Sequence, residues 1–327
     1  MDYIHKLKNL LPRDLHPHLG AARRRLRTLP ARTRRQKQRL LDDPAMETKE
    51  RELLKQVETR ISAGDGMYTG DGAHYYKVGL SAIRSIEEAI DAAQLESLTR
   101  ILDLPCGHGR VLRFLVRRFP QAEITASDLD RKGVDFCSRL FGTQAVYSEL
   151  NLDEFSVGRQ FDLIWCGSLV THLNETGIRA LLAFFARHLQ PDGLLIFTAH
   201  GERVIQLLQD QEFEYGIAPE SVAPIIEAYH KGGFGFADYP GASAYGISLT
   251  SPEWIRRAAA EIGLGEVYFS AHGWDNHQDV YGFTLQNRRL WENIRGLSVI
   301  RRSERGESGA RSRTSCEFAG LELSIQG

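Results

Sequence analysis

Two segments place carboxylates directly after short apolar runs, and one of them adds two glycines, an arrangement suited to binding a ligand. In DLPCGHGR, Asp103 ends the run and is followed by Gly107 and Gly109. Such glycines let the backbone pass close under a ligand, and a helix start beyond them favours a polar or anionic group. In ASDLD, Asp128 stands where an acid can accept hydrogen bonds from both ribose hydroxyls, and Leu129 offers an apolar surface to a nucleobase. The two segments predict a site for a nucleoside-bearing ligand.

A dinucleotide is the main alternative ligand, and the spacing argues against it. The dinucleotide fingerprint is Gly-x-Gly-x-x-Gly, whereas Leu112 stands three residues after Gly109. The missing third glycine, with an acid already at Asp103, indicates a ligand without a pyrophosphate. A carboxylate there suits the ammonium of an amino-acid moiety instead.

Residues able to move a proton gather in a later loop, AHGWDNHQDVYGF. It contains His272, Trp274, Asp275, His277 and Asp279. His277 with Asp279 can act as an oriented general base. The cluster could instead bind a divalent ion, or form a polar turn with Trp274 packed on the sheet.

Two further histidines, His172 and His200, each follow a strand-length apolar run, and either could equally be a loop histidine bonded to backbone. Residues 202–250 then form an extended insertion in which glycines alternate with tyrosines and phenylalanines. Such a segment suits a substrate lid over a carbohydrate or a flat organic acceptor. An irregular cap that only covers the sheet is the alternative.

The elements that position these residues alternate between strands and helices. Strands are expected at 101–104, 123–127, 145–148, 161–166, 193–198, 267–270 and 280–285. Helices are expected at 47–61, 78–93, 111–119, 132–141, 176–189 and 252–262. This alternation predicts an α/β fold with a mainly parallel sheet, in which ligands bind beyond the carboxyl ends of the strands.

The chain divides into a basic arm at 1–43, a helical segment at 44–98, an α/β domain at 99–287 and a tail at 288–327. Residues 1–40 contain twelve Lys or Arg and two Asp, a net charge of +10, which leaves −11 for residues 41–327 because the whole chain carries −1. The arm is expected to be a solvated, partly helical or disordered leader. The alternative is a patch that contacts an anionic surface or an acidic partner.

Cysteine usage and the first residues indicate a cytoplasmic protein. The four cysteines show neither a Cys-x-x-Cys pair nor zinc-type spacing, so no metal site is expected from them. No run has the length of a transmembrane segment, and the first residues lack the apolar core of a signal peptide.

The motif series resembles that of class I S-adenosylmethionine-dependent methyltransferases. It consists of DLPCGHGR, ASDLD, FDLIWCGSLVTHL and LQPDGLLIFTAHG, within a resemblance covering about 68–286. It implies a Rossmann-like, seven-stranded sheet of order 3-2-1-4-5-7-6, with the last strand antiparallel and helices on both faces. It also implies S-adenosyl-L-methionine as the cofactor.

The resemblance further implies roles for particular residues. Asp103 and the loop of Pro105, Cys106, Gly107 and Gly109 would bind the methionine end. Asp128 and Leu129 would bind the nucleoside, and Cys166 and Gly167 would line the pocket floor. The segment 74–79 would cover the cofactor. Within it Tyr76, or Tyr75, would face the sulfonium, or else only pack the preceding helix. Pro105 replaces the family's first glycine, so the turn there must keep φ near −65°.

The acceptor follows from the resemblance and from the histidines. The HQDV loop makes the chain similar to bacterial methyltransferases associated with polysaccharide assembly, so a hydroxyl of a sugar or a small metabolite is expected. His277 with Asp279 is the expected base, and His172 is the second candidate. Two alternatives stay open: an RNA or protein methyltransferase that docks through the arm, and a catalytically silent binding protein.

Overall fold

The computed structural model describes residues 28–286, and its centre is a seven-stranded sheet of order β3-β2-β1-β4-β5-β9-β8. The strands are β1 (Arg100–Asp103), β2 (Glu123–Asp128), β3 (Gln144–Tyr147), β4 (Phe161–Cys166), β5 (Leu189–Ala199), β8 (Leu264–Trp274) and β9 (Gln278–Leu285). The first five strands are parallel, and β9 runs antiparallel to both β5 and β8. The predicted fold class and strand order are confirmed.

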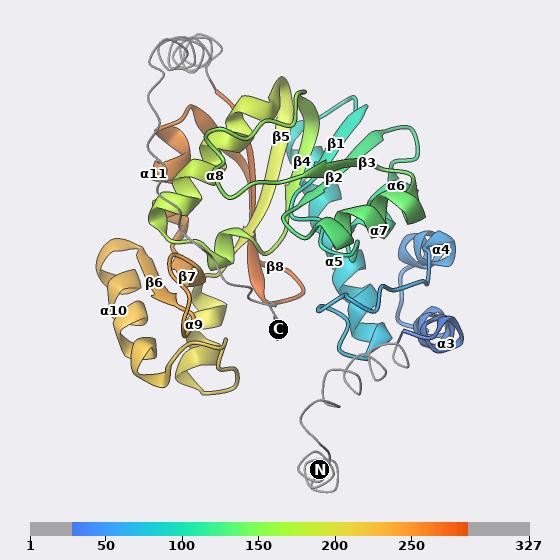
Figure 1. The fold of residues 1–327 in the computed structure, drawn as a ribbon, viewed down its shortest axis with the longest axis horizontal. Coiled ribbons are helices and arrows are strands. Elements are labelled where there is room, and N and C mark those ends of the chain that lie inside the picture. Colours follow the sequence, from blue (N-terminus) through green and yellow to red (C-terminus); the bar gives the residue numbers. More distant parts are fainter. Residues whose placement is uncertain (1–27, 287–327) are drawn as a thin grey trace, which may run out of the picture.

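Helices cover both faces of this sheet, as Figure 1 shows. One face packs against α5 (Gly72–Ala93), α6 (Leu112–Arg118) and α7 (Arg131–Phe141). The other packs against α8 (Glu175–His188) and α11 (Pro252–Ala260). Neighbouring strand residues belong to opposite cores because side chains alternate along a strand. Trp165 packs in the first core and Cys166 in the second.

Two N-terminal helices, α3 (Pro30–Leu41) and α4 (Thr48–Gln56), precede α5. Part of the predicted basic arm is therefore a packed helix, and residues 1–27 lie outside the described part of the chain. Lys37 is buried, and its ammonium donates to the carbonyls of Lys55 and Val57 at 2.8 Å each. That cation caps backbone carbonyls and does not contribute to a solvated basic surface.

Helix α5 begins earlier than the sequence pattern predicts. Asp71 is its N-cap and accepts hydrogen bonds from the backbone N–H groups of Ala73 and His74. The segment 74–79, expected to cover the cofactor, is thus helical from its first residue. Because the segment 64–72 is rich in glycine, which favours a loop, the pattern placed the helix start about six residues too late.

The insertion at 202–250 folds into a cap with its own small core. It consists of α9 (Glu202–Gln209), a 3₁₀ turn η3 (Pro219–Ser221), α10 (Val222–Gly232) and an antiparallel hairpin of β6 (Phe234–Asp238) and β7 (Gly246–Thr250). This hairpin was not predicted from the sequence, because its glycines are typical of loops. A Cβ at Gly235 would lie 2.1 Å from the Ile225 carbonyl oxygen, so close backbone packing requires glycine there.

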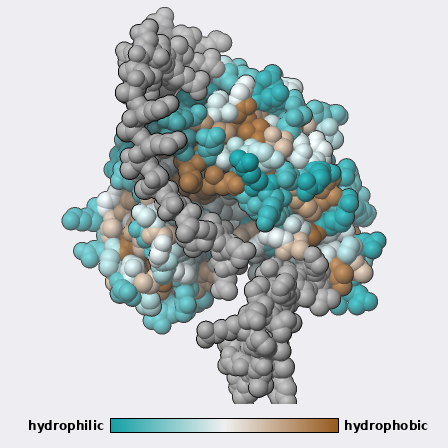
Figure 2. Space-filling view, in the orientation of Figure 1, coloured by the Kyte–Doolittle hydropathy of each residue, from teal (hydrophilic) through white to brown (hydrophobic). Residues whose placement is uncertain are grey.

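The cap and the N-terminal helices flank the end of the sheet at which β5 terminates (Figure 1). Hydrophilic residues cover much of the face in Figure 2, and apolar residues form separate patches between them. Among residues 28–286, no helix combines the length and apolar character that crossing a membrane requires.

Candidate functional site

The end of β1 carries a buried carboxylate with unused hydrogen-bonding capacity. Asp103 is 1% exposed, and its Oδ2 has no hydrogen-bond partner among the described residues. Burial raises the pKa of Asp103 well above its usual value, and the negative charge of Asp128 raises it further. A buried acceptor without a partner is costly, so this atom is suited to a donor supplied by a ligand.

The loop after β1 turns sharply beneath this carboxylate. The Leu104–Pro105 peptide bond is cis, and the Cys106 N–H donates to the Ser127 carbonyl at 3.0 Å. Gly107 has φ +48°, and a Cβ built on it would meet no atom within 4 Å. The space over Gly107 is therefore open, as a backbone that passes under a ligand requires.

Gly109 is required for a different reason. Its φ is +80°, and an added Cβ would lie 2.7 Å from the Phe141 ring and 3.1 Å from Cys137 Sγ. Helix α7 therefore packs directly against this turn.

Asp128 connects the ends of β1 and β2. Its Oδ2 accepts a hydrogen bond from the Gly107 N–H at 2.8 Å, and its Oδ1 accepts from the Asp130 N–H at 2.9 Å. Burial raises the pKa of Asp128, and these two hydrogen bonds oppose the increase. Leu129 beside it is 53% exposed, so its side chain is free to cover a flat ring.

The end of β4 meets the β8–β9 turn at Trp274. Cys166 is fully buried, and a Cβ on Gly167 would lie 3.0 Å from the Trp274 ring. Trp274 donates its indole N–H to the Val78 carbonyl of α5 at 3.0 Å. Helix α5, the end of β4 and the β8–β9 turn thus converge on one indole.

The two tyrosines of α5 pack inward. Tyr75 is 1% exposed and donates its hydroxyl to Asp65 at 2.6 Å, while the Arg113 guanidinium lies 5.2 Å from its ring centroid. Tyr76 is fully buried, its hydroxyl has no partner among the described residues, and burial raises its pKa to about 12. These contacts favour the packing role for Tyr75 and Tyr76, and contact with a sulfonium stays a prediction.

His277 lies beside Tyr215, a cap residue that was not predicted as part of the site. Its Nε2 is 2.5 Å from the Tyr215 hydroxyl, and the two rings stack with centroids 5.7 Å apart. Burial lowers the pKa of His277, and the positive charge of Arg203 lowers it further. Tyr215 was missed because no periodicity or motif in 202–250 distinguishes one aromatic residue from another.

Asp279 does not pair with His277 in the described contacts. Its Oδ1 accepts from the His272 backbone N–H at 2.9 Å, and a Cβ on Gly201 would lie 2.1 Å from its Oδ2. Burial raises the pKa of Asp279. The expected His–Asp pair is replaced in this structure by a His277–Tyr215 pair.

The other two histidines also contact the cap. His172 Nδ1 lies 3.1 Å from the Gly246 carbonyl oxygen and 2.9 Å from the Tyr239 hydroxyl. His200 is 3% exposed, its Nδ1 has no partner among the described residues, and its ring centroid is 5.6 Å from that of His277. Burial lowers the pKa of both His172 and His200. Uncharged imidazoles from three segments therefore face the cap.

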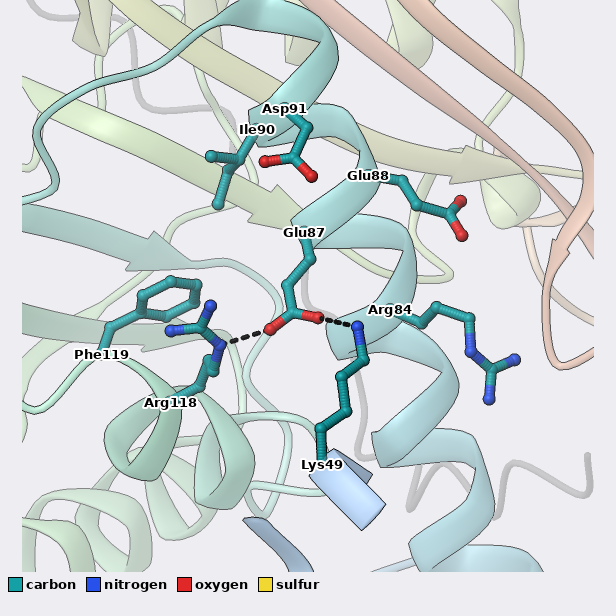
Figure 3. Close-up of a pocket in the computed structure, with 8 residues that line it drawn as sticks. All are labelled: Lys49, Arg84, Glu87, Glu88, Ile90, Asp91, Arg118 and Phe119. Carbon is teal, nitrogen blue, oxygen red and sulfur yellow. Dashed lines mark hydrogen bonds and ion pairs between the residues drawn. The ribbon is translucent and has the colours of Figure 1, made fainter. Parts of the chain in front are cut away.

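Two other arrangements do not support a binding site. Within residues 28–286, no group of three His, Cys, Asp or Glu side chains could hold a metal ion, so the divalent-ion alternative has no structural support. A surface pocket beside α5 is shown in Figure 3, where Glu87 bridges Lys49 and Arg118. None of its lining residues comes from the ends of the strands.

Residues 101–193 match the family model of a methyltransferase domain. The chain is similar to a malonyl-[acyl-carrier protein] O-methyltransferase of Acetivibrio thermocellus, at 28% identity over 115 residues, 34% of this chain and 40% of that protein. It is also similar to a trans-aconitate 2-methyltransferase of Pseudomonas paraeruginosa, at 32% identity over 138 residues, 42% of this chain and 49% of that protein. The chain thus spans less than half the length of either relative.

Among solved structures, the chain is similar to an S-adenosylmethionine-dependent methyltransferase from Clostridium acetobutylicum. The TM-score is 0.45 at 16% identity, over 65% of this chain and 92% of that chain. The matched residues 101–193 run from β1 to within β5, the strands that bring Asp103, Asp128 and Gly167 together. The part of the chain that matches a methyltransferase domain is therefore the part that builds this site.

Proposed function

We propose that this protein is an S-adenosylmethionine-dependent methyltransferase that methylates a hydroxyl of a small molecule, preferentially of a sugar or glycan. The observation that carries the proposal is the unpartnered Oδ2 of Asp103, a buried carboxylate at the end of β1. An ammonium group would satisfy it with a charge-assisted hydrogen bond. The amino-acid end of S-adenosylmethionine supplies such a group.

The neighbouring residues fit the rest of that cofactor. The space over Gly107 is open, Asp128 has a carboxylate placed for ribose hydroxyls, and exposed Leu129 can cover the adenine. When bound, S-adenosylmethionine supplies an electrophilic methyl group. The protein must then hold the acceptor in line and accept its proton.

We assign to His277 the role of accepting that proton. Tyr215 is the residue that orients the His277 ring. A lowered pKa keeps the imidazole neutral, and therefore basic, at neutral pH. Tyr215 takes the orienting role first expected of Asp279, because Asp279 hydrogen-bonds to the backbone of His272. His172, bonded to Tyr239 of the cap, is the second candidate.

The side chains around His277 favour a hydroxyl acceptor over a carboxylate acceptor. The acceptors for which the two relatives are named, malonyl-acyl-carrier protein and trans-aconitate, are acids. A carboxylate needs no base and is best bound by cations. Around His277 the close contacts are instead the uncharged groups of Tyr215 and His200, while Arg203 acts only through its charge. Neutral polar groups beside aromatic rings suit carbohydrate.

Calorimetry tests the cofactor first, with S-adenosylmethionine, S-adenosylhomocysteine and NADH as the three ligands. Saturable binding of the first two without NADH is the expected result. Binding of NADH alone would overturn the proposal. A panel of sugars, small alcohols and di- or tricarboxylic acids, followed with methyl-labelled cofactor, then tests the acceptor. Label transfer only to acids would overturn the hydroxyl assignment and leave the cofactor assignment intact.

A further inference from the structure

Ser168, two residues after the end of β4, has a backbone conformation that serine rarely adopts. Its φ is +59°, in the left-handed region. An L-residue there brings its Cβ close to a carbonyl oxygen, so a turn that needed only this conformation would favour glycine. Strained residues that their surroundings hold in place are concentrated at functional sites. The strain indicates that the serine side chain has a role which glycine could not supply.

Two side chains from neighbouring strands hold Ser168 in this conformation. Its backbone N–H donates to Thr198 Oγ1 at 2.8 Å, and Gln278 Nε2 donates to its hydroxyl oxygen at 3.1 Å. Thr198 in turn donates its hydroxyl to Gln278 Oε1 at 2.6 Å. Thr198 is fully buried and Gln278 nearly so, whereas Ser168 is half-buried. A buried polar network therefore supports a side chain that solvent and ligands can reach.

The direction of each hydrogen bond follows from the donors that must be satisfied. Thr198 Oγ1 already accepts the Ser168 N–H, so its own buried proton requires the oxygen of the Gln278 amide. The amide nitrogen of Gln278 must then face Ser168. Thr171 is also fully buried, and within residues 28–286 its hydroxyl contacts only Ser168 Oγ, at 3.4 Å. Ser168 Oγ thus serves both neighbours as an acceptor, and its own proton is left for a ligand.

Ser168 lies between the proposed cofactor residues and the cap. Gly167, directly before it, lies against the ring of Trp274, which a Cβ at Gly167 would approach to 3.0 Å. Beyond it, Leu173 pairs with Tyr245 of the cap in an isolated β-bridge. The amide that holds the Ser168 hydroxyl belongs to the residue after His277. The free donor is therefore placed where the cofactor side and the proposed base meet.

We propose that the Ser168 hydroxyl binds the methyl acceptor by donating a hydrogen bond to a second oxygen, next to the one that is methylated. The assignment rests on the proposed function, because it takes a hydroxyl-bearing acceptor as the ligand. The methylated oxygen loses electron density as it attacks, so a hydrogen bond donated to it would weaken in the transition state and slow the reaction. A neighbouring oxygen has no such conflict. The acceptor class is thus a sugar or another vicinal diol, and not a simple alcohol.

Methyl transfer from labelled S-adenosylmethionine tests this contact. The probes are the sugar of the acceptor panel with the highest kcat/KM and its deoxy analogues, each lacking one hydroxyl next to the methylated position. Ser168→Ala and Ser168→Gly should both lower kcat/KM for the sugar by about 10-fold, mainly through a higher KM, with the Kd of S-adenosylhomocysteine unchanged. One deoxy analogue should show the same loss with the wild-type protein and no further loss with either variant.

The two variants separate the hydroxyl from the backbone conformation. Ser168→Gly relieves the left-handed strain and Ser168→Ala does not, so the glycine variant should have the higher melting temperature of the two although both lose the same activity. Gln94→Gly is the matched control. It relieves similar strain at the exposed C-cap of α5, where φ is +51°, and should transfer methyl groups as the wild-type protein does.

Three results would overturn the assignment. Wild-type activity in Ser168→Gly would show that the serine serves only the turn. An equal loss on the sugar and on every deoxy analogue in both variants would show that Ser168 maintains the structure of the site and does not contact the acceptor. A simple alcohol as the best acceptor would exclude the second oxygen. Failure of the wild-type protein to methylate any hydroxyl compound would instead overturn the proposed function, and this inference with it.

Discussion

The Oδ2 atom of Asp128 accepts a hydrogen bond from the backbone N–H of Gly107 at 2.8 Å. The acid at the end of β2 thereby supports the glycine loop at the end of β1, its neighbour in the sheet. A ligand lying over Gly107 would meet that same carboxylate. Loop geometry and the proposed nucleoside binding therefore depend on one side chain.

Replacing Asp128 should weaken cofactor binding. Asp128→Ala removes charge-assisted hydrogen bonds worth about 1.5–3 kcal/mol each, so the Kd for S-adenosylhomocysteine should rise at least about 10- to 100-fold in calorimetry. Asp128→Asn keeps one oxygen acceptor and should lose less affinity than Asp128→Ala. Asp192→Ala, at an exposed acid of β5, is the control. Normal affinity of Asp128→Ala would exclude the ribose assignment.

Asp103→Asn should abolish cofactor binding and raise stability. The pKa of Asp103 is raised in the folded protein, so the ionised form destabilises the fold above the ordinary carboxyl pKa of about 4. At pH 7 a gain on the order of 1 kcal/mol would raise the melting temperature by roughly 2–4 °C. The gain should shrink as the pH falls and disappear below about pH 4. A lower melting temperature at pH 7 would show that the carboxylate is satisfied in the fold.

The rate of methyl transfer should depend on the neutral form of His277. Burial and the charge of Arg203 lower the pKa of His277, so turnover should stay high below the ordinary histidine pKa of about 6.5 and fall only at more acidic pH. His277→Ala should reduce kcat by about 10²–10⁴-fold without changing cofactor affinity. His230→Ala, at an exposed histidine of α10, should leave both unchanged. Full turnover in His277→Ala would remove His277 from the mechanism.

Tyr215→Phe tests the partner of that base. The variant keeps the ring that stacks on His277 and loses the hydroxyl at 2.5 Å. We expect kcat to fall by about 10-fold, because the loss of a hydrogen bond of ~1 kcal/mol frees the imidazole to reorient. The acidic limb of the pH–rate profile should also be displaced. Asp279→Asn should change the profile less, because Asp279 hydrogen-bonds to the His272 backbone. A larger effect of Asp279→Asn than of Tyr215→Phe would indicate that Asp279 is the orienting residue.

Gly79→Ala should destabilise the packing of α5 on α6. An added Cβ would lie 2.1 Å from the ring of Phe114, which is fully buried. Overpacking of this kind costs about 1–3 kcal/mol, measurable by chemical denaturation. Gly232→Ala is the matched control in α10, where no atom lies within 4 Å of the added Cβ. Equal free energies of unfolding for Gly79→Ala and the wild-type protein would show that Phe114 can move aside.

The sheet was predictable from the sequence because its strands are short apolar runs separated by helical segments. The predicted strand at 161–166 coincides with β4, and the order of the seven strands was anticipated from the family resemblance. Strand ends were less accurate: β5 begins at Leu189 rather than 193, because polar residues at its start hide the extended conformation. The β6–β7 hairpin was missed because glycine indicates a loop in sequence, whereas Gly235 serves close packing of two backbones.

The residues proposed to bind the cofactor could be identified from the sequence itself. Asp103, Gly107, Gly109 and Asp128 lie at fixed distances from strands that local patterning reveals, and parallel strands must end at one edge. The acceptor side was decided only by the tertiary structure. Tyr215 is 62 residues from His277 in the chain, and only the packing of the cap brings them together. Long-range contacts of this kind leave no local periodicity, so the sequence could supply the histidine but not its partner.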